Sequence, residues 1–153
     1  MKTLNPESTI TFLEMAWNGL TRGRVYIWVN SDTTEARQFV DLCTGQRGSS
    51  FLNTRLTRVW NKGIPGECVF GGNYDSGVNR MLPSDSCCDE DSVMFMSHTE
   101  ESGEFIINTN GKSPKFGIVI GEVWCGLKVL EEVIQLSDIT QVTVVDCGVR
   151  VVA

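Results

Sequence analysis

Two adjacent cysteines and the single histidine of the chain are the first residues to consider for chemistry. Cys87 and Cys88 stand among acidic residues, and His98 follows them. Thiolates and imidazole bind zinc, but adjacent cysteines on a loop rarely serve one tetrahedral ion, and the sequence contains no Cys-x-x-Cys pair. Neighbouring carboxylates also discourage thiolate formation, which disfavours a redox pair. We therefore expect neither a metal nor another cofactor.

A second candidate stretch, residues 56–74, carries a lone arginine among apolar side chains. It reads as two short strands, Leu56–Trp60 with Arg58 on it and then residues 68–70, joined by a turn rich in glycine and proline. The double glycine at residues 71–72 fits a tight bend. Trp60 ends the first of these strands, and if exposed it would be a candidate anchor for a protein partner.

Composition limits the class of protein. With 153 residues, 41% of them hydrophobic, the chain is long enough for a single domain, residues 1–153, with a sizeable core. It has no apolar run of membrane-spanning length and no signal-peptide pattern, so no membrane association is expected. Six scattered cysteines favour the reducing cytoplasm or nucleus. A formal net charge of −6 disfavours direct nucleic-acid binding.

The hydrophobic periodicity predicts a mostly β fold. A capping-box spacing at Asp32 and a glycine at Gly45 bound a first helix, and Asn18 and Gly19 turn a hairpin. A polar surface loop is expected over residues 75–91, and a second helix with Leu127, Leu130, Val133 and Ile134 inward over 126–136. Strands are predicted over 9–16, 24–29, 56–60, 68–70, 92–96, 105–108, 118–123 and 142–152. These elements predict a closed antiparallel eight-stranded β-barrel with two α-helices covering its ends.

Four segments of the sequence resemble the cyclophilins, a family of peptidyl-prolyl isomerases. They are residues 39–45 (Phe-Val-Asp-Leu-Cys-Thr-Gly), 70–74 (Phe-Gly-Gly-Asn-Tyr), 121–133, and 144–148 (Val-Val-Asp-Cys-Gly), in the order and near the spacing of the family. The resemblance spans residues 9–149. It implies a cyclophilin-like β-barrel with a groove for prolyl peptides, and, since the family includes such domains on large proteins, a parent polypeptide longer than this domain.

The resemblance also implies which residues line the groove. The family arginine, which polarises the prolyl nitrogen as the amide twists, corresponds to Arg58. The implied peptide groove comprises Thr57, Arg58, Glu67, Cys68, Phe70, Ser97, His98, Thr99, Phe105 and Ile106.

Most of these groove positions depart from the family pattern. Thr57 replaces a histidine, Phe70 a glutamine, Cys68 a methionine, and Glu67 and Ile106 replace phenylalanines. A carboxylate at the pocket wall must be solvated or paired, and the nearest expected partner is the arginine itself, which would withdraw that cation from catalysis. The pocket is therefore expected to be poorer than in active members.

These departures favour a protein-interaction domain with a degraded prolyl-isomerase groove, little or no isomerase activity, and a protein or peptide partner. This hypothesis predicts that Glu67 or Phe70 occupies the place of the prolyl ring. The alternative is an active or weakly active peptidyl-prolyl cis-trans isomerase that uses Arg58, which predicts an open apolar cleft walled by Phe70 and Phe105. The third hypothesis is a purely structural domain. It predicts that the chain exposes no large apolar patch.

Overall fold

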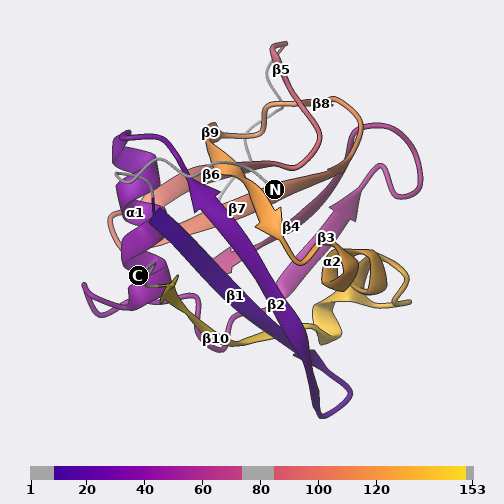
Figure 1. Cartoon of the computed structure of the whole chain (residues 1–153), viewed down its shortest axis with the longest axis horizontal. Helices are drawn as coiled ribbons and strands as arrows, with labels where there is room; N and C mark the ends of the chain where they lie inside the picture. The colour runs from indigo at the N-terminus through magenta and orange to yellow at the C-terminus, as the bar shows by residue number, and fades with distance from the viewer. Residues whose placement is uncertain (1–8, 74–84, 151–153) are drawn as a thin grey trace.

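The computed structural model describes residues 9–73 and 85–150, which form one strongly curved sheet with a helix at each end (Figure 1). The elements, in chain order, are β1 (Thr9–Trp17), β2 (Leu20–Val29), α1 (Thr34–Thr44), β3 (Leu56–Trp60), β4 (Glu67–Asn73), β5 (Cys87–Cys88), β6 (Ser92–Thr99), β7 (Ser102–Asn110), β8 (Ser113–Pro114), β9 (Ile118–Cys125), α2 (Leu127–Ile134), the 3-10 helix η1 (Ile139–Gln141) and β10 (Thr143–Arg150).

The main sheet has eight antiparallel strands in the order β10-β1-β2-β9-β6-β7-β4-β3. The mostly β class is confirmed, because 52% of the described residues lie in strands. The prediction of a closed barrel is wrong: the sheet curls through 242° and stays open. Its edge strands, β3 and β10, meet at the isolated bridge between Arg55 and Thr143. Closure needs matched strands along the whole seam, and the five residues of β3 are too few to accompany the eight of β10.

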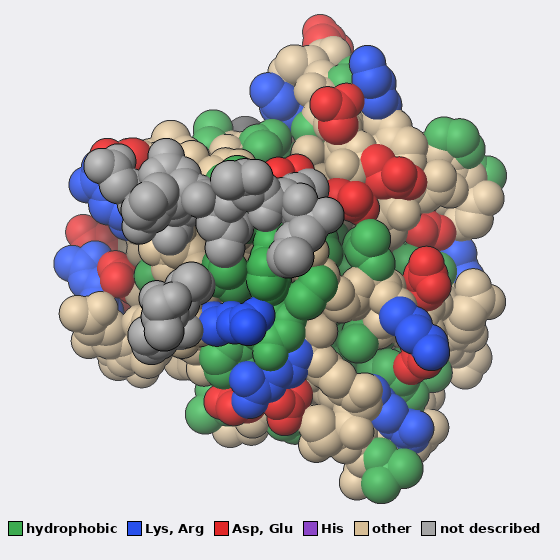
Figure 2. All heavy atoms as spheres, in the orientation of Figure 1, with side chains coloured by type: hydrophobic (Ala, Val, Ile, Leu, Met, Phe, Trp, Pro, Cys, Tyr) green, Lys and Arg blue, Asp and Glu red, His purple; other side chains and the backbone are tan. Residues whose placement is uncertain are grey.

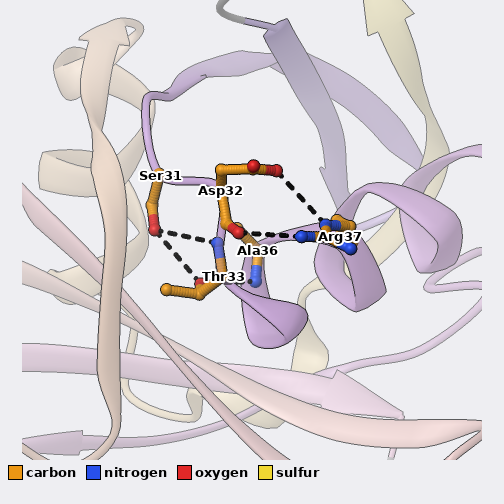
Figure 3. Close-up of polar contacts among 5 residues, drawn as sticks. All are labelled: Ser31, Asp32, Thr33, Ala36 and Arg37. Atoms are coloured by element: carbon orange, nitrogen blue, oxygen red, sulfur yellow. Dashed lines mark hydrogen bonds and ion pairs between the residues drawn. The ribbon is translucent and has the colours of Figure 1, made fainter.

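The first helix is capped one residue later than the sequence suggested. The hydroxyl of Thr33, not the carboxylate of Asp32, accepts the N–H of Ala36 at 3.1 Å. Asp32 instead pairs with the guanidinium of Arg37 at 3.2 Å (Figure 3). The C-terminal cap is as expected, because Gly45 has a left-handed φ of 70° and its N–H bonds to a carbonyl in the last turn.

A core of packed aromatic rings fills the inside of the curved sheet beneath α1. The ring of Phe51, from the segment between α1 and β3, lies 5.4 Å from the ring of Phe39 and 5.2 Å from that of Phe105. Phe95 closes the group at 6.0 Å from Phe39. The helix, the connecting segment and two central strands are therefore held together by one set of ring contacts.

The second helix is shorter than expected and less buried at its start. Leu130, Val133 and Ile134 are buried as predicted, whereas Leu127 is 38% exposed. The expected loop over residues 75–91 is described only from residue 85, and there it contains β5, which pairs with β8 to form a separate two-stranded sheet. The last two residues of the final predicted strand lie outside the described residues.

Replacing Phe51 by alanine is expected to reduce the free energy of unfolding by about 3–5 kcal/mol, because the cavity lies among rings that cannot collapse into it. Denaturant unfolding followed by tryptophan fluorescence measures the change. Leu52→Ala is the control: this neighbouring side chain is 46% exposed, so its truncation should cost no more than about 0.5 kcal/mol. Equal losses in the two variants would contradict the assignment of Phe51 to the core.

Candidate functional site

A second apolar cluster covers the outer face of the sheet where β4, β6 and β7 run side by side. On β4, Val69 belongs to the inner core, so its neighbours Cys68 and Phe70 point outward. We call this group the outer cluster. Its buried members are Cys68, Phe70, Cys88, Met94, Met96, Ile106 and Phe116, and Trp60 and Val119 pack against them.

Phe70 is at the centre of the outer cluster. Its side chain is only 1% exposed, and its ring meets that of Phe116 edge to face at 5.0 Å. The ring of Trp60 also meets that of Phe116 edge to face, at 5.0 Å between centroids. The guanidinium of Arg58 lies over the Phe70 ring at 3.9 Å from its centroid, within the range of a cation–π contact. The arginine is thus held against an aromatic ring of its own chain.

A β-bulge puts Arg58 on this face. Leu56 pairs with Gly71 and Arg58 pairs with Phe70, so Thr57 is an extra residue in β3. If the two strands paired regularly, without this bulge, Arg58 would point to the same side as Leu56, into the inner core. The hydroxyl of Thr57 donates to the carbonyl of Phe70 at 3.2 Å and so ties the bulge to β4.

Glu67 lies away from the outer cluster. Its carboxylate accepts the hydroxyl of Thr109 at 2.6 Å and the backbone N–H of Gly63 at 2.8 Å. The side chain is 6% exposed and lines a pocket of about 210 Å³ beside α2. The partners of this carboxylate are therefore Thr109 and Gly63, rather than Arg58 as the sequence had suggested. Two charge-assisted hydrogen bonds compensate for its burial.

Other residues of the implied groove are also dispersed. Phe105 faces the inner core, and Thr99 lies beside α1, where its carbonyl accepts the side chain of Gln38 at 2.7 Å. Ser97 lines a polar pocket with residues of α1. His98 is half-buried and is the extra residue of a β-bulge in β6, where the pairing with β7 shifts between Ser97 and Thr99.

The structure therefore brings together about half of the implied groove residues. These are Thr57, Arg58, Cys68, Phe70 and Ile106. It adds Phe116, which the sequence analysis did not include. Phe116 lies in the short segment between β8 and β9, where no strand or helix periodicity marks it as buried.

The thiol of Cys68 in the outer cluster is protected from ionisation. Burial raises the pKa of Cys68 to about 11, against a smaller opposing effect of a hydrogen bond with Ser113. Within residues 9–73 and 85–150, no set of three or more His, Cys, Asp and Glu side chains is arranged to hold a metal ion.

A separate aromatic surface lies on the outer side of β1, β2 and β9. Tyr26 contacts Phe12 at 6.2 Å and Trp124 at 6.4 Å between ring centroids, and Arg150 lies over both Tyr26 and Trp124. Figure 2 shows hydrophobic side chains near the centre of this view, with basic side chains next to them. Trp124 is half-buried, as is Trp28, so each is less buried than core packing would require.

Comparisons with known proteins bear on the fold. No family model and no curated protein matches the sequence. Among solved structures, the cyclophilin of Mimivirus is similar, with a TM-score of 0.67 and 14% identity, over 97% of this chain and 92% of the viral chain. The chain therefore has a cyclophilin-like fold. At 14% identity, the similarity supports the fold and nothing about function. No helix among the described residues is long and apolar enough to cross a membrane.

Alkylation should distinguish Cys68 from the exposed thiols. With a pKa of about 11, roughly one Cys68 thiol in a thousand is ionised at pH 8, and the side chain is fully buried. Iodoacetamide at pH 8 is therefore expected to modify Cys87 and Cys125, which are exposed, long before Cys68. Peptide mass spectrometry measures the order, and denatured protein is the control in which the difference should disappear. Rapid labelling of Cys68 in the folded protein would contradict its burial.

Proposed function

We propose that this chain is a protein-interaction domain of cyclophilin-like fold with little or no prolyl-isomerase activity. The observation that carries the proposal is the position of Phe70, buried between Phe116 and the guanidinium of Arg58. The proposal extends to a protein or peptide partner in the cytoplasm or nucleus, and to a place within a larger polypeptide.

Isomerisation requires an apolar pocket for the proline ring and a cation near the prolyl nitrogen, both available at the same time. Here Phe70 fills the apolar surface next to Arg58. A prolyl ring could take that place only if Phe70 became exposed, which costs about 1.5–3 kcal/mol for a side chain of this size. This cost alone would weaken peptide binding roughly 10- to 150-fold.

Binding a protein partner requires fewer precisely placed groups than catalysing isomerisation does. Trp60 is half-buried and meets Phe116 edge to face, Arg58 precedes it by two residues on β3, and Ile64 in the following turn is 53% exposed. Tryptophan and arginine are the residue types that most often dominate protein–protein binding energy. A rigid aromatic base with a cation at its edge can bind a peptide segment without twisting an amide.

The alternative, an isomerase that uses Arg58, has one observation in its favour: the bulge at Thr57 directs this arginine to the outer face. The position of the guanidinium argues against this alternative, because it lies over the Phe70 ring at 3.9 Å from the centroid.

NMR exchange spectroscopy on a short X-Pro peptide tests the two functions. Uncatalysed exchange takes tens to hundreds of seconds, so even weak catalysis is measurable. We expect the same exchange rate with no protein, with the wild-type domain and with Arg58→Ala, because Phe70 fills the apolar surface next to Arg58. An active cyclophilin acting on the same peptide is the positive control. Acceleration by the wild type that disappears in Arg58→Ala would overturn the proposal.

The same titration tests whether the outer cluster binds peptide. Changes in the amide signals of Arg58, Trp60 or Phe70 without acceleration would support a surface used for binding only. An unchanged spectrum at high peptide concentration would contradict peptide binding at this face.

A further inference from the structure

A pocket of about 210 Å³ lies beside α2 and shares no described residue with the outer cluster. Four carboxylates line it, those of Glu67 on β4, Glu90 and Asp91 just before β6, and Glu131 on α2. None of the described residues that line it is a lysine or an arginine. We call it the acidic pocket. Its acidic side chains come from three separate parts of the chain.

The rest of the lining is mainly aliphatic. Leu127, Leu130 and Ile134 are at positions i, i+3 and i+7 of α2 and therefore share one face of the helix. Leu130 and Ile134 are buried, whereas Leu127 at the helix start is 38% exposed. The acidic pocket thus offers both a charged and an apolar surface to a ligand.

We propose that the acidic pocket binds the basic side chain of a protein partner, an alkyl cation such as that of lysine or arginine. Both side chains combine a stem of methylene groups with a charged head. The stem packs on the aliphatic face of α2, and the head reaches the carboxylates. The inference rests on the proposed function only in taking the partner to be a protein, because the acidic pocket and the outer cluster are separate surfaces.

Glu67 is the most deeply placed acceptor of the acidic pocket, because the residue is only 6% exposed. The hydroxyl of Thr109 donates to one of its carboxylate oxygens at 2.6 Å, and the N–H of Gly63 donates to the other at 2.8 Å. An ionised carboxylate has about four lone-pair positions, so each oxygen can accept a further hydrogen bond. The two existing bonds also hold the carboxylate in place before a ligand arrives, which lowers the ordering cost of binding.

The chain around Glu90 and Asp91 is held in place as well. The carboxylate of Glu90 accepts the N–H of Gly111 at 3.0 Å. The N–H of Asp91 donates to the carbonyl of Asn108 at 2.9 Å, and its carbonyl accepts the N–H of Val123 at 2.8 Å. Hydrogen bonds to β7 and β9 therefore position this acidic segment without any ligand.

The lining suits an alkyl cation better than a metal ion. Calcium takes about six to eight oxygen ligands, and an aliphatic wall supplies none. Within residues 9–73 and 85–150, no three acidic side chains are arranged to hold one ion. An ammonium group carries three donors and a guanidinium five, so one head group can bond to carboxylates that do not converge on a single point.

The charge of the whole chain favours a basic partner too. The formal net charge is −6, which attracts a cationic protein over a distance and raises its rate of association. The buried carboxylate and the aliphatic wall then add specificity, because a basic side chain must fit both.

Chemical-shift titration of the isotope-labelled full chain tests the site with capped tripeptides Gly-X-Gly. The residue X is lysine, arginine, or one of their neutral analogues norleucine and citrulline. We expect a basic peptide to shift the amide signals of Glu67, Thr109 and the α2 residues with a millimolar Kd. The neutral analogues should bind at least about tenfold more weakly, because they lose the charge-assisted hydrogen bonds. The basic peptide that binds more tightly identifies the preferred head group.

Glu131→Gln and Glu132→Gln are a matched pair of variants. Both remove one negative charge from an exposed position of α2, but only Glu131 lines the acidic pocket. Glu131→Gln should weaken binding about two- to fivefold, as is typical of an exposed ion pair, and Glu132→Gln should leave it unchanged. Glu67→Gln should weaken it about tenfold or more, because this carboxylate is buried.

The comparison of charged and neutral peptides uses the wild type and does not depend on the folding of any variant. The proposal is overturned if neither basic peptide shifts the signals of the acidic pocket, or if the neutral analogues shift them equally. It is also overturned if Glu132→Gln weakens binding as much as Glu131→Gln. The signals of Arg58, Trp60 and Phe70 report on the outer cluster in the same spectra, so the two proposals can fail separately.

Discussion

The packing of Phe70 between Arg58 and Phe116 is the contact on which the outer face of this sheet depends. It makes β4 a strand that is buried on both sides, with Val69 in the inner core and Phe70 in the outer cluster. A strand of this kind needs apolar residues in succession rather than alternation. The Phe70 ring therefore occupies the place next to Arg58 that a ring from another chain would take. Arg58 becomes part of the packing.

Backbone register decides which side chains share a surface. The bulge at Thr57 turns Arg58 outward, whereas Glu67 accepts its two hydrogen bonds from Gly63 and Thr109 beside α2. An arginine and a carboxylate on paired strands thus take up different surroundings. The expectation that they pair was reasonable from their charges, but opposite charges attract only where the backbone lets the side chains meet.

The apolar surroundings of the outer cluster act in two ways. Aromatic rings and methionines exclude water, which closes the face to a prolyl ring. The same burial raises the pKa of Cys68 to about 11 and so makes this thiol unreactive toward ordinary reagents.

The sequence by itself determined the local elements and the kinship of the fold: the hairpin at Asn18–Gly19, the helix that ends at Gly45, and a mostly β chain of cyclophilin-like type. These follow from periodicity and turn residues, which act over short stretches. Only the tertiary structure decided that the sheet stays open, that Phe105 faces inward while Phe70 is buried outward, and that Arg58 lies over the ring of Phe70. Those outcomes depend on strand register and on contacts between residues far apart in the chain, which no local pattern encodes.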